Sequence, residues 1–256
     1  MIENLFDVST VLSVSNVAVF LFVLIGGVLI SLSVHFIPIG GAPAAMAQAT
    51  GVGTGTTQLA AGAGLTGLLA AGSVSAVTNN LYLPLFIGSI SSCLMIAITM
   101  FSANLVYIFG VGCPLVSGKR QRDVITKDRQ DVYVSKGTEG HGTPTASFFS
   151  GLIGGLIGGF GGSLTYVSIL YLCTKTVGIS FAGSAAFAAT CSIALFYINS
   201  VIASYNIGGT IEGFTDQKFK KMPKAIFVSS IASAIFGIIT IATVYLFIVP
   251  ATGGIF

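Results

Sequence analysis

The sequence predicts an all-α integral membrane protein with about six transmembrane helices. Only 7% of its 256 residues are charged and 54% are hydrophobic, whereas soluble domains carry roughly 25% charged residues. The apolar residues gather in runs about as long as the 20 residues that a helix needs to cross a bilayer core. Glycine and proline interrupt some of these runs, and small residues recur at helical spacing, which predicts Gly/Pro-interrupted helices with small-xxx-small packing.

We expect one polytopic membrane domain over residues 1–256. The acidic N-terminal segment lacks the basic start of a secretory signal, so the first apolar run is predicted to be a retained span. The predicted spans cover about residues 11–36, 44–71, 85–110, 148–172, 181–203 and 225–249. The predicted loops on the cytoplasmic side cover about residues 117–144 and 205–224.

The second span differs from the others in composition. Residues 33–69 carry no formal charge and are rich in Gly, Ala and Thr, and the run Pro38–Pro43 interrupts the chain directly after the first span. Non-helical backbone at membrane depth is tolerated only where protein or a water-filled cavity satisfies its polar groups. This segment is therefore predicted to lie inside the helix assembly, next to polar groups.

The fourth span carries two glycine ladders at a spacing of four residues. One ladder consists of Gly151, Gly155 and Gly159, and the other of Gly154, Gly158 and Gly162. Small residues at this spacing let helix backbones approach closely. We predict that this span is a buried contact helix.

Charge placement predicts the orientation of the chain. The loops at 117–144 and 212–224 carry ten of the eleven Lys and Arg residues, and Lys175 is the remaining one. Because cytoplasmic loops are enriched in Lys and Arg, these two loops are predicted to lie on the cytoplasmic side. We therefore expect a multi-pass protein of the cell membrane with both termini outside.

A short repeat links the two halves of the chain. Ile39-Gly40-Gly41 and Ile207-Gly208-Gly209 each follow a strongly apolar run. Paired interruptions in two halves are typical of transporters with internal repeats. Three shared residues leave open whether the halves are a true repeat.

Catalytic machinery is not evident from the residue pattern. The four cysteines form no CxxC pair, the apolar runs contain no paired carboxylates, and no Ser/His/Asp arrangement is visible. GVGTGT at residues 51–56 lacks the remaining features of a nucleotide-binding loop. His35 is expected to bond the backbone near the end of the first span, with a role in an ion or proton path as the alternative. These observations favour an ion-conducting subunit of a larger assembly or a self-contained small-solute transporter over an autonomous enzyme.

Three blocks of unusual composition resemble the D subunit of tetrahydromethanopterin S-methyltransferase from methanogenic archaea. They are HFIPIGGAPAAMAQATGVGTGTTQLAAGAGLTGL, ITKDRQDVYVSKGTEGHGTPTASFFSGLIGG and INSVIASYNIGGTIEGFTDQKFKKMPKA. The resemblance implies a multi-subunit membrane complex that moves a methyl group from methyl-tetrahydromethanopterin, through a cobamide on a partner subunit, to coenzyme M, coupled to sodium export. It implies the C and E membrane subunits and the lipid bilayer as partners, no nucleic acid, no cofactor bound by this chain and no catalytic residue in it.

On that reading, the predicted breaks at Pro38–Pro43 and Asn206–Gly209 border a sodium path. Sodium is a hard cation that prefers oxygen ligands, and unwound backbone and nearby polar side chains supply them. The candidates are Thr54, Thr56, Thr57, Asn199, Asn206 and Glu212, with Gln48 possible. No span carries a carboxylate, so the counter-charge is expected from Glu212 or from a partner subunit. The alternative is a purely structural subunit, whose small polar residues only bond between packed helices.

Overall fold

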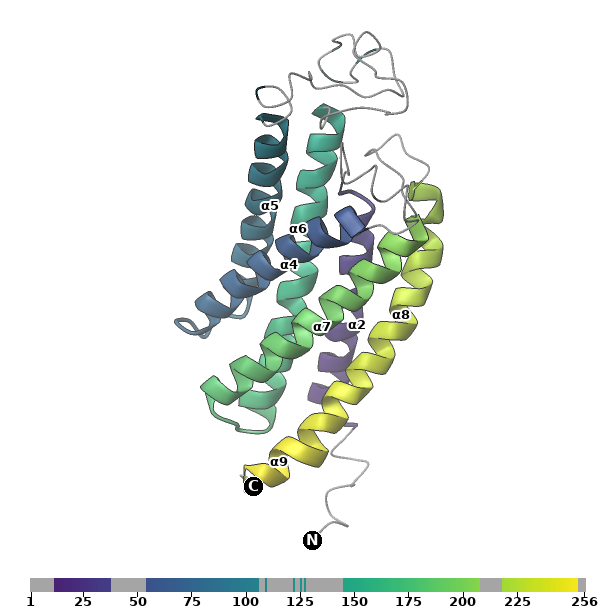
Figure 1. Cartoon of the computed structure of the whole chain (residues 1–256). Coiled ribbons are helices and arrows are strands. Elements are labelled where there is room, and N and C mark those ends of the chain that lie inside the picture. The colour runs from purple at the N-terminus through teal and green to yellow at the C-terminus, as the bar shows by residue number, and fades with distance from the viewer. Residues whose placement is uncertain are drawn as a thin grey trace.

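The computed structural model describes a bundle of long helices (Figure 1). The described residues are 12–37, 54–105, 109, 122, 125, 127, 145–207 and 218–252, and the side chains of residues 54–61, 103, 146, 147 and 218 are not described. The long helices are α2 (Val14–Val34), α4 (Thr54–Ser75), α5 (Tyr82–Leu105), α6 (Thr145–Tyr171), α7 (Phe181–Ile207) and α8 (Lys218–Thr243). A π-helical turn (η4, Leu172–Thr176) extends α6, and η5 (Val244–Ile248) with α9 (Val249–Ala251) extends α8. The predicted all-α fold is confirmed.

Five of these helices are long and apolar enough to cross a membrane by length and composition. Within α4, the residues whose side chains are described, Gly62–Ser75, form a shorter apolar helix. The sequence of α4 is rich in Gly, Ala and Thr, where an ordinary span has large aliphatic residues. The weak second span of the sequence is thus a helix that depends on its neighbours for burial.

The described helix bounds differ from the expected spans on either side of residues 208–217. The helix α7 continues to Ile207 and α8 begins at Lys218. The predicted break over Asn206–Gly209 is therefore wrong at its first residue, because Asn206 is helical, and Gly208 and Gly209 lie outside the described residues. The Asn206 side-chain amide donates to the backbone carbonyl of Lys221 (2.8 Å), and Lys221 Nζ donates to the carbonyl of Ile207 (3.1 Å). The second bond satisfies an otherwise orphaned carbonyl at the end of α7.

The helix α6 is the most buried element of the bundle. Of its most apolar window, 72% is buried, against 44% for α2 and 33% or less for the other candidate spans. It packs against α2, α4, α5 and α7. The prediction that the fourth span is a buried contact helix is confirmed.

The two glycine ladders of α6 face two different neighbours. A Cβ added at Gly155 would lie 2.8 Å from the Cα of Cys93 on α5. On the other ladder, a Cβ at Gly158 would lie 2.7 Å from Ser33 Oγ on α2. Distances under 3.0 Å leave no room for a side chain, so each ladder permits one close helix crossing.

The helices form two triplets of opposite orientation. In Figure 1, α2, α5 and α7 run upward along the chain, whereas α4, α6 and α8 run downward. The first triplet is α2–α4–α5, and the second is α6–α7–α8. The second triplet thus repeats the order of the first with every direction reversed, as in any chain of six alternating helices, so the contacts between helices test for an inverted-topology repeat.

The contacts between the triplets obey the same symmetry. If α2, α4 and α5 are equivalent to α6, α7 and α8, then the α2–α8 contact has its counterpart in α6–α5, and α2–α7 in α6–α4. The α4–α5 contact likewise corresponds to α7–α8. The IGG echo of the sequence does not mark this repeat, because the connection after α2 is equivalent to the one after α6 and not to the one after α7.

Candidate functional site

A band of buried polar side chains on α2, α7 and α8 runs along the interior of the bundle. Each side chain in this band has a relative exposure of 0%. We call it the polar seam; it consists of Ser31, Asn199, Ser200, Ser204, Ser229 and Ser233. Buried polar groups carry a free-energy cost unless they are bonded, so their partners decide what the seam can do.

The pair Asn199 and Ser233 anchors the seam at the crossing of α7 and α8. Asn199 Nδ2 donates to Ser233 Oγ (3.1 Å) and to the carbonyl of Leu195 (3.0 Å). The hydroxyl of Ser233 in turn lies 3.4 Å from Asn199 Oδ1. On α2, Gly27 faces this pair, because an added Cβ would overlap Ser233 Oγ and lie 2.9 Å from Asn199 Nδ2. Three helices therefore meet around one amide.

The seam continues about one helical turn from this pair, toward the end where α2 stops. Ser31 follows Gly27 by one turn on α2, Ser229 precedes Ser233 by one turn on α8, and Ser204 follows Ser200 by one turn on α7. Because α2 and α7 run in one direction and α8 in the other, these steps all lead toward the same face (Figure 1). A four-residue step along a helix is about 6 Å.

Four hydroxyls of the seam have no hydrogen-bond partner within the described part of the chain. They belong to Ser31, Ser200, Ser204 and Ser229. Two other serines of these helices bond back to their own backbone: Ser33 Oγ donates to Ile30 O (2.7 Å) and Ser230 Oγ to Ile226 O (2.8 Å), whereas Ser192 of α7 also lacks a partner in the described part of the chain. The four seam hydroxyls thus retain their donor and acceptor capacity.

His35 lies beyond the seam, at the C-terminal end of α2. It is fully buried, and its Nδ1 lies 2.9 Å from the carbonyl oxygen of Ser31. Since a carbonyl oxygen can only accept, Nδ1 carries the hydrogen in this bond. The expected backbone bond of His35 is confirmed, and it orients the imidazole next to the seam.

The structure places only one predicted sodium-path residue in the seam, namely Asn199. Asn206 lies seven residues further along α7, about 10 Å by helical rise, where it joins the ends of α7 and α8. Thr54, Thr56 and Thr57 begin α4, but their side chains are not described, and Gln48 and Glu212 lie outside the described residues.

Sequence reasoning missed the five serines of the seam. Serine is common in this chain, and its hydropathy value is the same whether the side chain is buried or exposed. The available signal was spacing, since Ser200 with Ser204 and Ser229 with Ser233 each lie four residues apart and so share a helix face. Only the packing of the helices shows that these faces are buried.

Carboxylates and catalytic clusters are absent from the described part of the chain. All eight acidic residues fall outside it, and its described residues contain no group of three His, Cys, Asp or Glu side chains that could hold a metal ion. The seam therefore offers hydroxyl and amide groups without a fixed negative charge in the described part of the chain. Such a set suits hydrogen bonding or the partial coordination of a cation.

Comparison with known proteins decides the family. A family model for the D subunit of tetrahydromethanopterin S-methyltransferase matches residues 16–233. The chain belongs to this D-subunit family. The match includes the whole polar seam.

Relatives in this family are similar over nearly their full length. The D subunit of the methyltransferase from Methanosarcina barkeri is 55% identical over 228 residues, which cover 86% of this chain and 91% of the relative. That of Methanosarcina mazei is 53% identical over 90% of this chain and 95% of its own length. The relative from Methanopyrus kandleri is 48% identical over 90% and 96%, respectively.

Proposed function

We propose that this chain is a membrane subunit of a tetrahydromethanopterin S-methyltransferase complex and that it forms part of the sodium path of that complex. In this proposal, the complex moves a methyl group from methyl-tetrahydromethanopterin, through a cobamide held by a partner subunit, to coenzyme M. This chain performs none of these transfer steps. The observation that carries the proposal is the polar seam, in which four hydroxyls have no bond to the described part of the chain and are buried among helices apolar enough to cross a membrane.

The chemistry of the seam suits a hard cation. Sodium prefers oxygen ligands, and the buried hydroxyls of Ser31, Ser204 and Ser229 are oxygen atoms with no bond inside the described part of the chain. An unsatisfied buried hydroxyl costs about 1–3 kcal/mol. Occupation by water or a cation removes this cost, so the seam favours a hydrated or ion-conducting interior.

The charge balance of the seam points to a shared site. A bare cation in a low-dielectric interior needs a nearby negative charge, and the described residues contain no carboxylate. We propose that the counter-charge comes from Glu212 or from a partner in the membrane, with the C and E subunits as the candidates. This chain then forms half of an ion site at a subunit boundary.

The inverted arrangement of the two helix triplets supports a transport role. Many transporters place their substrate or ion site where two inverted repeats meet. The seam joins α2 of the first triplet to α7 and α8 of the second. The same feature favours the second candidate, a self-contained small-solute transporter.

The test uses the whole complex, reconstituted into lipid vesicles. Methyl transfer is measured against sodium concentration for the double variant Ser204→Ala/Ser229→Ala and for Asn199→Leu, Thr56→Val and Asn206→Leu. Ser230→Ala is the matched control, because its hydroxyl is already bonded to its own helix. We expect Ser204→Ala/Ser229→Ala and Asn199→Leu in the seam, and Thr56→Val and Asn206→Leu outside it, to shift the sodium concentration that gives half-maximal rate. The complex should still assemble, and the Ser230→Ala variant should respond normally.

An unchanged sodium response in all seam variants would make this chain a structural scaffold. The sodium path would then lie in the partner subunits. Sodium-dependent uptake of a small solute by vesicles that contain this chain alone would favour the self-contained transporter.

A further inference from the structure

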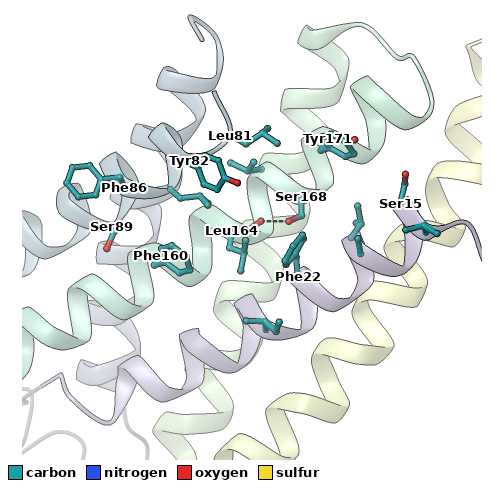
Figure 2. A pocket seen from close by; sticks show the side chains of 16 residues that line it. Ser15, Phe22, Leu81, Tyr82, Phe86, Ser89, Phe160, Leu164, Ser168 and Tyr171 are labelled. Atoms are coloured by element: carbon teal, nitrogen blue, oxygen red, sulfur yellow. Dashed lines mark hydrogen bonds between the residues drawn. The ribbon is translucent and has the colours of Figure 1, made fainter. Parts of the chain in front are cut away.

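An apolar groove opens on the surface of the bundle between α2 and α5, with α6 as its floor (Figure 2). Its volume is about 870 Å³. Phe22 on α2, Phe86 on α5 and Phe160 on α6 line it, and all three remain exposed, by 46%, 61% and 38%. A volume of this size lies within the range of sites that bury most of a bound organic molecule.

A smaller polar pocket of about 280 Å³ continues the groove at one end. Leu81, Val167 and Tyr171 line both cavities, so the two form one continuous feature. Figure 2 shows Leu81 and Tyr171 at the end of the groove opposite Phe160. The lining of the polar pocket adds the side chains of Asn79, Thr174 and Lys175.

The change from apolar to polar follows the axis of the bundle. The polar pocket lies at the connections α4–α5 and α6–α7. These connections are on the face of the bundle opposite the C-terminal ends of α2 and α5 (Figure 1). The groove runs from there toward the middle of the apolar helices. Tyr82 and Tyr171 lie at the transition, as tyrosines do at a membrane–water interface.

The polar pocket carries a single positive charge. Lys175 is exposed, and it is the one Lys or Arg of the sequence outside the two basic loops. The two segments that line the pocket, residues 75–84 and 167–181, contain no Asp or Glu. The Lys175 ammonium, the Asn79 amide and the Thr174 hydroxyl can all donate hydrogen bonds to an anion.

We propose that the groove and the polar pocket together bind one anionic membrane lipid. Its hydrocarbon chains occupy the groove along Phe22, Phe86 and Phe160, and its phosphate lies beside Lys175. A lipid matches the two-part lining in one molecule, apolar along most of its length and negatively charged at the membrane surface. A partner's transmembrane helix would fill the apolar groove but leave the charged pocket without a counterpart.

The lipid is tested by native mass spectrometry of the intact, delipidated complex after incubation with dioleoylphosphatidylglycerol or with dioleoylphosphatidylcholine. We expect the complex to retain more phosphatidylglycerol than phosphatidylcholine. Lys175→Gln should lower its retention roughly tenfold, since a hydrogen-bonded charge contributes about 1.5–3 kcal/mol. Lys220→Gln on α8 is the matched control for charge and should retain the lipid.

A second variant tests the groove itself. Ala18→Phe places an aromatic ring on the groove wall and should reduce retention of both lipids, whereas Ala186→Phe on the exposed face of α7 should not. Millimolar inorganic phosphate should fail to displace the phosphatidylglycerol. Displacement by phosphate, or unchanged retention in both Lys175→Gln and Ala18→Phe, would overturn the proposal, in favour of a free-anion site or of a groove covered by a partner helix.

Discussion

Asn199 of α7 and Ser233 of α8 are hydrogen-bonded to each other in the buried centre of the bundle, with Nδ2 and Oγ 3.1 Å apart. Gly27 of α2 lies against the same pair. Because α2 belongs to the first triplet and α7 and α8 to the second, the two halves of the chain meet where Gly27 packs against this pair.

Loss of both partners of this pair should destabilise the protein by less than the sum of the two single losses. Asn199→Leu leaves the Ser233 hydroxyl without its amide partner, at a cost of about 1–3 kcal/mol. Adding Ser233→Ala removes the stranded hydroxyl, so the double variant should be less destabilised than the sum of the single variants. The measurement is the midpoint of thermal inactivation of the purified complex for the full double-mutant cycle. Thr243→Val, at an exposed hydroxyl bonded to its own helix, is the control. Strictly additive effects of Asn199→Leu and Ser233→Ala would contradict an interaction between the two side chains.

Gly27 should not tolerate even a methyl group. A Cβ there would overlap Ser233 Oγ, and such overpacking typically costs about 1–3 kcal/mol. Gly27→Ala should therefore lower thermal stability and the yield of assembled complex. Gly183→Ala is the matched control, because its Cβ would meet only Ser180 Oγ, at 3.6 Å, and Ile179 Cγ2, at 3.9 Å. Equal yields of the two variants would contradict the close crossing of α2 and α8.

The glycine ladders of α6 should be needed for its contacts with α5 and α2. Gly155→Leu would collide with the backbone of Cys93 at the α5 crossing, and Gly158→Leu with Ser33 at the α2 crossing. Both variants should reduce the amount of complex recovered by size-exclusion chromatography. Leu156→Phe, at a partly exposed position of the same helix, controls for added bulk. Normal recovery of both glycine variants would place these faces of α6 in lipid.

The two basic loops should be accessible from the cytoplasm only. The C-terminal ends of α5 and α7 lie on one face of the bundle together with the N-terminal ends of α6 and α8 (Figure 1). By their Lys and Arg content, the loops between these ends are predicted to be cytoplasmic. In a variant without native cysteines, Ser135→Cys and Gln217→Cys should resist a membrane-impermeant thiol reagent added to intact cells, and Asn79→Cys on the opposite face should react. Reaction of either loop cysteine from outside would reverse the orientation.

The fold was largely predictable because hydropathy reports burial in a bilayer directly. Long runs such as 14–34 and 225–243 are apolar whatever their neighbours are, and the glycine ladders indicated close packing of α6 without saying which helices approach. The ends of α7 and α8 were less predictable, because the bonds between Asn206 and Lys221 and between Lys221 and Ile207 depend on the two helix ends being adjacent.

The candidate site was less predictable than the fold. Asn199 stood out in the sequence as an amide inside an apolar run, but Ser31, Ser204 and Ser229 did not. Their significance comes from complete burial without a bond in the described part of the chain, which is a property of the packing and not of any one segment. The inverted arrangement was equally hard to predict, because it is visible in the directions and contacts of the helices. The repeated IGG tripeptide does not mark it, since it follows α2 and α7, which are not equivalent helices.

Direct measurement of sodium movement tests the central claim of this account. The complex is reconstituted into sealed vesicles, methyl transfer is started, and uptake of radioactive sodium is followed for the parent, for Ser204→Ala/Ser229→Ala and for Ser230→Ala. The account predicts that the seam double variant takes up less sodium per methyl group transferred, whereas Ser230→Ala matches the parent. An unchanged ratio of sodium to methyl groups in the seam variant would contradict the claim that this chain forms part of the path.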